Sequence, residues 1–108
     1  RSNKNLASPY ICYYNKSMKI EFDSAKDAAN LAKHGVSLAV AGRLDWENAL
    51  IWADTRQHYG EPRQAALGLI DDRVYFVAFV DRGDARRIIS LRKANYREAK
   101  YYVETLPD

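Results

Sequence analysis

The side chains best suited to chemistry in this sequence are bases, acids and cations rather than metal ligands or nucleophiles. The candidates are Lys33, His34, Glu61, Arg63, Arg92 and Lys93. Metal-free cleavage of RNA needs only these residue types, because the substrate's own 2′-hydroxyl attacks the neighbouring phosphorus. A base takes the proton of that hydroxyl, an acid protonates the departing 5′-oxygen, and cations stabilise the charged transition state.

Other common site types are missing from the sequence. It has no Walker loop, no Gly-x-Gly-x-x-Gly run, no His-Glu-x-x-His motif and no cluster of cysteines and histidines. The acidic residues are scattered, without the grouping that a two-metal phosphodiesterase requires. His58 lies in a polar loop and is a weaker candidate for an RNA contact. We therefore expect no metal site and no cofactor.

Most of these candidates also have a purely structural interpretation. Lys33 and His34 would sit in the last turn of a helix, where cations favour the helix dipole and bond the free carbonyls. Glu61-Pro62-Arg63 could form a turn with a surface ion pair, worth about 0–1 kcal/mol.

Arg92 is harder to explain as a surface residue. It follows an apolar strand in line with Ile88, so we expect its side chain to be half buried. A half-buried guanidinium needs a partner. That partner could be Glu61, or it could be a substrate phosphate, which arginine can hold with two hydrogen bonds.

The charge of the chain is concentrated in two places. Residues 1–17 contain three basic and no acidic residues, and the rest contains 14 of each. Within that balanced part, residues 86–100 hold six basic residues against Glu98 alone. Such a block is typical of phosphate contacts, and it adds Arg87 and Arg97 to the candidates. The alternative is a solvated helix and edge strand.

The length predicts one folded domain over residues 18–108, preceded by a leader of unknown role over residues 1–17. No apolar run approaches the roughly 20 residues of a membrane span. The single cysteine, Cys12, excludes an internal disulfide framework. A soluble protein of the reducing cytoplasm fits these features.

The first half of the domain predicts a strand and two helices. Lys19–Phe22 alternates as a strand does. Asp23 or Ser24 can cap a first helix, which Gly35 ends. A buried stripe is expected on this helix at Ala28, Leu31 and Ala32, and Ser37 can cap a second helix.

The second half predicts a meander of strands over residues 63–70, 73–81 and 86–93, and a last helix over residues 95–106. Val74–Val80 is apolar on both faces and is expected in mid-sheet, between antiparallel neighbours. The fold class is therefore α+β, with a four-stranded antiparallel sheet, two N-terminal helices on one face and a C-terminal helix.

Three blocks of the sequence resemble the BrnT family of ribonuclease toxins from type II toxin–antitoxin systems. Lys33–Ser37 is similar to the end of the family's first helix, residues 54–68 to its central loop and second strand, and residues 87–98 to its last strand and helix start. The blocks keep the family's order and cover most of residues 18–103. One departure is Phe22, where family members usually have tryptophan.

The resemblance implies a RelE-like fold and an endoribonuclease that arrests translation. It also implies neutralisation by a BrnA-like antitoxin with a ribbon-helix-helix part, through which alone the toxin would reach operator DNA. The family's motif residues fall on His34, Glu61, Arg63 and Arg92, with Lys33, Lys93 and Arg97 as RNA contacts.

The individual roles are our assignment. Arg92 and Arg63 would hold the scissile phosphate, Glu61 or His34 would be the base, and the other of these two, or Lys33, the acid. Two alternatives stay open: a non-catalytic module that binds an antitoxin and acts as corepressor, and a domain that binds single-stranded RNA without cutting it.

Overall fold

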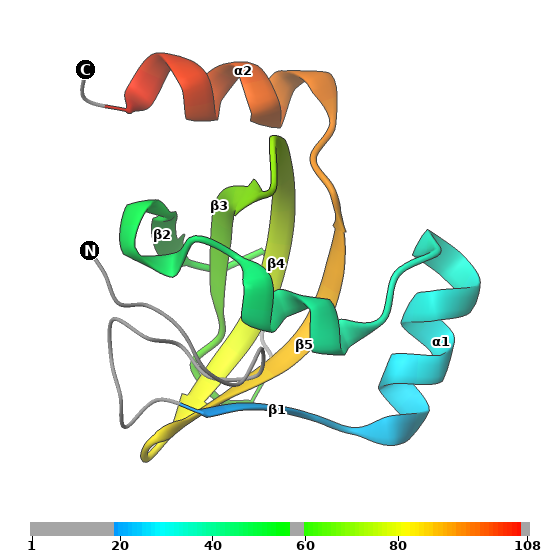
Figure 1. Ribbon diagram of the computed structural model, residues 1–108. Coiled ribbons are helices and arrows are strands. Elements are labelled where there is room, and N and C mark those ends of the chain that lie inside the picture. The colour runs from blue at the N-terminus through cyan, green and yellow to red at the C-terminus, as the bar shows by residue number, and fades with distance from the viewer. Residues whose placement is uncertain (1–18, 57–59, 107–108) are drawn as a thin grey trace.

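The computed structural model describes residues 19–56 and 60–106, so the expectations for residues 1–17 and for His58 lie outside the described residues. One sheet has the strand order β1-β5-β4-β3-β2 (Figure 1). Its strands are β1 (Lys19–Phe22), β2 (Leu50–Ala53), β3 (Gln64–Ile70), β4 (Arg73–Arg82) and β5 (Ala85–Lys93). The helices are α1 (Ser24–His34), the 3-10 helices η1 (Leu38–Arg43) and η2 (Trp46–Asn48), and α2 (Tyr96–Thr105). None of the described helices is long and apolar enough to cross a membrane.

The α+β class is confirmed, but the expected number of strands and the purely antiparallel sheet are wrong. The missed strand is β2, whose apolar residues do not alternate with polar ones and so carry no period of two. β1 pairs with β5 in parallel, so the sheet is mixed. β4 lies between antiparallel neighbours, as its apolar character predicted.

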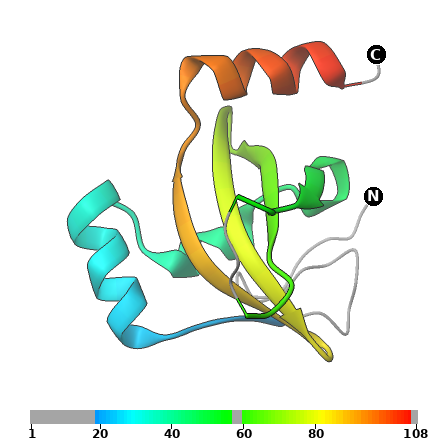
Figure 2. The same cartoon turned by 180° about the vertical axis from the view of Figure 1, so that it is seen from behind.

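The two faces of the sheet are covered by different elements. η1 and η2 cover one face with Leu38, Ala41 and Trp46, and Phe22 packs partly buried against the same cluster. α2 covers part of the other face, where the fully buried Tyr102 packs against β3 and β4. Seen from both sides, α2 lies across one end of the sheet and α1 stands beside the β5 edge (Figure 2). We expected two N-terminal helices on one face. This is right for the second, η1, and wrong for the first, α1.

Helix α1 turns its polar side inward, which contradicts the stripe expected from its sequence. Ala28, Leu31 and Ala32 are exposed, and Asn30 is the buried residue. The reason is the partner: α1 docks against the backbone of β5 where β1 has ended, and backbone groups require hydrogen bonds. The Asn30 side chain donates to the Leu91 carbonyl at 2.8 Å and accepts from the Leu91 N–H at 3.1 Å.

A bulge in β5 sets which face its last residues occupy. Phe79 pairs with Ile88 but Ala78 pairs with Ser90, so β5 has one extra residue at this point. Ile88 and Leu91 consequently both belong to the core under η1. Arg92 emerges on the α2 side, and the expectation that it shares a face with Ile88 is wrong.

Candidate active site at the end of strand β5

Arg92 is held by two neighbouring side chains at the end of β5. Its guanidinium lies over the Phe76 ring, 4.3 Å from the centroid. Its two terminal nitrogens donate to the two carboxylate oxygens of Glu98, at 2.8 and 3.0 Å. The side chains of Arg92 and Glu98 are 29% and 23% exposed, so the predicted half-burial is confirmed. The partner is Glu98 of α2 rather than Glu61.

Glu98 also forms the capping box of α2. Its side chain accepts from the Asn95 N–H at 2.9 Å, and its own N–H donates to the Asn95 side chain at 2.8 Å. The hydrogen bonds from Arg92 are the main cause that lowers the pKa of Glu98. The start of α2 is therefore tied to the arginine at the end of β5 by a carboxylate that stays ionised.

His34 ends α1, close to the Asn30 contacts that attach this helix to β5. Its pKa is lowered by burial first, and then by the positive charges of Lys33 and Arg92. Gly35, in the left-handed conformation at φ 75°, closes the helix directly after it, as predicted. The neutral form of the imidazole is thus favoured more than in an ordinary histidine, in part by the charge of Arg92.

A second guanidinium joins this group from the loop after β2. Arg56 is bound to the buried carboxylate of Asp54 by two hydrogen bonds of 2.8 Å. It lies 5.5 Å from the centroid of Phe76 and contributes to the lowered pKa of Glu98. We call this group the Arg92 cluster: it consists of His34, Arg56, Phe76, Arg92 and Glu98.

Sequence reasoning missed three members of this cluster. Glu98 had a usable signal, because Asn95 followed three residues later by glutamate is a capping box, which places this carboxylate at the start of a helix. Arg56 and Phe76 had none, because their approach to Arg92 depends on the strand register and on the β5 bulge.

Glu61 lies elsewhere on the sheet. Its carboxylate is bound by Arg82 at 2.9 Å, beside the β4–β5 turn. Arg82 is six positions from Phe76 on β4, a separation of about 20 Å at the usual rise per strand residue. The structure therefore does not bring Glu61 to Arg92. Arg63 is half buried just before β3, where its carbonyl accepts from the Asp54 N–H at 2.8 Å.

The predicted RNA contacts divide into two kinds. Lys33, Lys93 and Arg97 are exposed, and within residues 19–56 and 60–106 they take part in no ion pair. Each is the immediate sequence neighbour of a member of the Arg92 cluster. Arg87 is different, because it lies earlier on β5 and is paired at 3.2 Å with Glu21 of β1.

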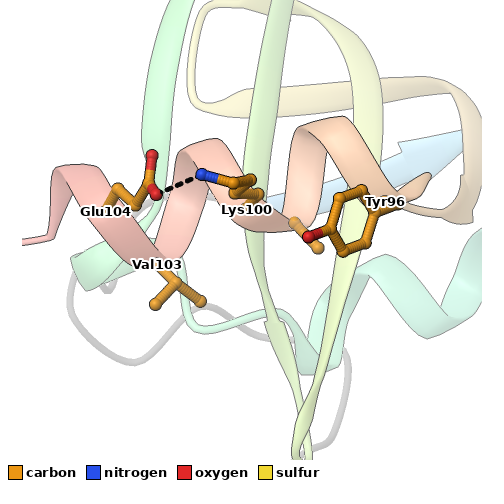
Figure 3. Close-up of a pocket in the computed structure, with 5 residues that line it drawn as sticks. Tyr96, Lys100, Val103 and Glu104 are labelled. Atoms are coloured by element: carbon orange, nitrogen blue, oxygen red, sulfur yellow. Dashed lines mark hydrogen bonds and ion pairs between the residues drawn. The ribbon is translucent and has the colours of Figure 1, made fainter.

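A pocket of about 340 Å³ lies on the outer side of α2 (Figure 3). Residues of this one helix line it: Tyr96, Ala99, Lys100, Val103 and Glu104. Tyr96 and Val103 are largely exposed, and Lys100 and Glu104 are joined by an ion pair. The pocket includes none of the candidate site residues. In the described part of the chain, no group of histidine, cysteine and acidic side chains could hold a metal ion.

Comparisons with known proteins agree on one family. Residues 22–98 match the family model described as "Ribonuclease toxin, BrnT, of type II toxin-antitoxin system". The chain is also similar to the crystal structure of the Brucella abortus ribonuclease toxin BrnT, with a TM-score of 0.57 and 30% identity. That similarity covers 72% of this chain and 97% of the Brucella chain. No curated protein sequence matches.

Proposed function

Because this chain belongs to the BrnT family of ribonuclease toxins of type II toxin–antitoxin systems, we propose that it cleaves RNA at the Arg92 cluster without a metal ion. One observation carries this proposal. His34 ends the helix that Asn30 attaches to Leu91, the residue before the ordered Arg92. Burial, and then the charges of Lys33 and Arg92, lower the pKa of His34. Lys33, Lys93 and Arg97 neighbour this group in the sequence and form no ion pair among the described residues. A base and a phosphate-binding group are two of the three parts that 2′-hydroxyl attack requires, and the third is an acid.

His34 acts as the base in this proposal. Its neutral imidazole takes the proton of the 2′-hydroxyl, whose oxygen then attacks the phosphorus and forms a 2′,3′-cyclic phosphate. Arg92 stabilises the negative charge that grows on the phosphoryl oxygens. Lys33, next to His34 and free of ion pairs among the described residues, protonates the departing 5′-oxygen. Glu61 takes no part in this step, because Arg82 binds its carboxylate beside the β4–β5 turn, away from Arg92.

The RNA backbone is bound by cations around the cluster. Lys33, Lys93 and Arg97 supply charges that no carboxylate of the described residues neutralises. Among the arginines predicted to contact RNA, Arg92 and Arg87 have carboxylate partners, so their charges attract phosphates less strongly. Arg63 would contact the strand away from the cleaved bond. A local patch of this kind can bind RNA even though residues 18–108 carry no net charge.

The partners follow from the family. We expect a BrnA-like ribbon-helix-helix antitoxin that neutralises the toxin and links it to operator DNA. We also expect a RelE-like arrangement of the fold, a cytoplasmic location and inhibition of translation through loss of RNA.

The test is expression of the chain in a bacterial host, alone and together with its antitoxin. We expect growth arrest and loss of RNA with the toxin alone, and rescue by the antitoxin. His34→Ala and Arg92→Ala should abolish the arrest while the variants remain folded and bind the antitoxin. Harmless expression of the unmodified chain, with intact antitoxin binding, would instead indicate a non-catalytic corepressor module.

A further inference from the structure

We propose that Glu98 is a positioning residue, which fixes the Arg92 guanidinium in the orientation needed to hold the scissile phosphate. This inference rests on the ribonuclease function proposed above. Glu98 touches no substrate in this account and acts only through Arg92. The carboxylate grips both terminal nitrogens of Arg92, and the Phe76 ring covers one face of the same group.

The hydrogen-bond pattern leaves one edge of the guanidinium open. Arginine has five N–H donors in a fixed fork. Glu98 receives one hydrogen from each terminal nitrogen, and the Lys93 carbonyl lies 3.3 Å from Nη1. Among the residues that the structure describes, the Nε hydrogen and the second Nη2 hydrogen have no acceptor, and both point to the same side. A phosphate can therefore bind this edge with two hydrogen bonds while Glu98 stays in place.

Fixing this group in advance favours catalysis. A free arginine side chain has many rotamers and loses them when it binds a phosphate. In this chain the side-chain entropy of Arg92 is lost when the protein folds, so Arg92 is already ordered when the transition state forms. The Arg92 side chain is 29% exposed, so part of it can be reached by a ligand.

The position of Glu98 is itself determined by the start of α2. The Asn95 N–H donates to the same carboxylate oxygen, Oε1, that binds Arg92 Nη1. Two other roles are therefore conceivable for Glu98. It could serve only as a helix cap, or it could act as a latch that occupies Arg92 and must leave before RNA binds.

The variant Glu98→Gln separates these three roles. Glutamine keeps the capping box, because its side-chain oxygen still accepts from the Asn95 N–H. It removes the negative charge, and its amide group presents N–H donors to a guanidinium that has only donors. Glu98→Gln should therefore loosen Arg92, which keeps at most the bond from Nη1 to the shared oxygen, and leave α2 intact.

The measurement is single-turnover and steady-state cleavage of a short RNA oligonucleotide by the full chain. We expect kcat to fall on the order of 10- to 100-fold in Glu98→Gln with KM changed much less, the sign of an interaction that matters in the transition state. Arg92→Ala should cost more, on the order of 10²–10³-fold. The double variant should equal Arg92→Ala alone, because Glu98 acts only through that arginine.

Asn95→Ala is the matched control. It removes the side-chain cap of the same helix turn but leaves the Arg92–Glu98 pair, so it should lower the melting temperature and retain kcat. An unchanged kcat in Glu98→Gln would assign Glu98 to capping alone, and an increased kcat would make it a latch; either result overturns the proposal. No cleavage by the unmodified chain would overturn the proposed function and this inference together.

Discussion

His34 differs from an ordinary surface histidine because burial and two cations act on it together. Lys33 and Arg92 both destabilise the imidazolium, so the pKa of His34 lies below 6.5. As the base, His34 must be neutral in the free enzyme. We predict that kcat/KM falls as the pH decreases, with an acidic limb centred below the ordinary histidine pKa of about 6.5. The pH–rate profile of RNA cleavage measures this.

The control for this prediction is a variant that lacks the titrating group. His34→Gln should show a much lower rate, without the same acidic limb. An acidic limb centred above pH 6.5 in the unmodified protein would contradict the assignment of His34 as the base.

The Arg92–Glu98 pair makes a prediction about acid stability. Arg92 lowers the pKa of Glu98 in the folded state, so the unfolded chain binds a proton more readily. The stabilisation is therefore complete above the ordinary pKa of glutamate and is lost as the pH falls below it. Urea titrations from pH 7 to pH 3 should show a loss of stability that is smaller in Glu98→Gln. Equal losses in the two proteins would mean that the pair contributes nothing to stability.

Among single residues, the sequence predicted environments better than partners. The half-burial of Arg92 followed from its place on an apolar strand, and the helix end at Gly35 from the conformational freedom of glycine. The pairing of Arg92 with Glu98 could not be predicted, because it depends on the face from which Arg92 emerges. One inserted residue in β5 decides that face.

At the level of elements, α1 offers the most direct test of how the site is built. Asn30 makes two bonds to Leu91 and a third, of 2.9 Å, to the Val36 carbonyl. Asn30→Ala leaves these backbone groups without partners in a buried place, which should cost about 2–4 kcal/mol of stability. Since the same contacts hold the end of α1 near Arg92, cleavage should fall as well. Denaturant unfolding and RNA cleavage measure the two effects.

Leu31→Ser is the control on the opposite side of the same helix. Leu31 is 52% exposed, so this change should alter stability by no more than about 0.5 kcal/mol, plus the small difference in helix propensity. The amphipathic pattern of the sequence predicts the reverse, with a larger loss of stability in Leu31→Ser than in Asn30→Ala. A large loss in Leu31→Ser with little loss in Asn30→Ala would contradict the observed docking of α1.

The elements that sequence reasoning placed correctly are those whose environment matches a simple period. β4 is buried on both faces and α2 on one, and the hydrophobic patterns of the two segments predicted this burial. α1 was placed correctly along the chain but turned the wrong way, because hydrophobic periodicity assumes an apolar partner. Its partner is a strand edge, which selects asparagine instead. The parallel pairing of β1 depends on a contact between distant segments and leaves no local signal.

At the scale of the whole molecule, charge is distributed so that only part of the basic block can attract RNA. Within residues 19–56 and 60–106, Lys33, Lys93 and Arg97 pair with no carboxylate, and each directly neighbours a member of the cluster in the sequence. If these three neutralise phosphates of a single strand, the logarithm of affinity should fall with the logarithm of salt concentration with a slope of about −2. Replacing each by alanine should reduce the slope by about 0.7. Fluorescence anisotropy at several salt concentrations gives these slopes.

Lys100→Ala is the control for this measurement. Lys100 is paired with Glu104 on the outer side of α2, beside the pocket and not beside the cluster. It should leave the slope unchanged. A slope that depends on Lys100 as strongly as on Lys33 would indicate that RNA binds the outer side of α2 and not the Arg92 cluster.

The proposed reaction is cleavage of RNA by 2′-hydroxyl attack, with the side chains of this chain and no metal. The most direct measurement is incubation of RNA with the purified chain in EDTA, followed by chemical analysis of the new 3′ ends. The account predicts cleavage that EDTA does not reduce, with 2′,3′-cyclic phosphate ends, and loss of both in Arg92→Ala. Cleavage that stops in EDTA, or that leaves 3′-hydroxyl ends, would contradict it.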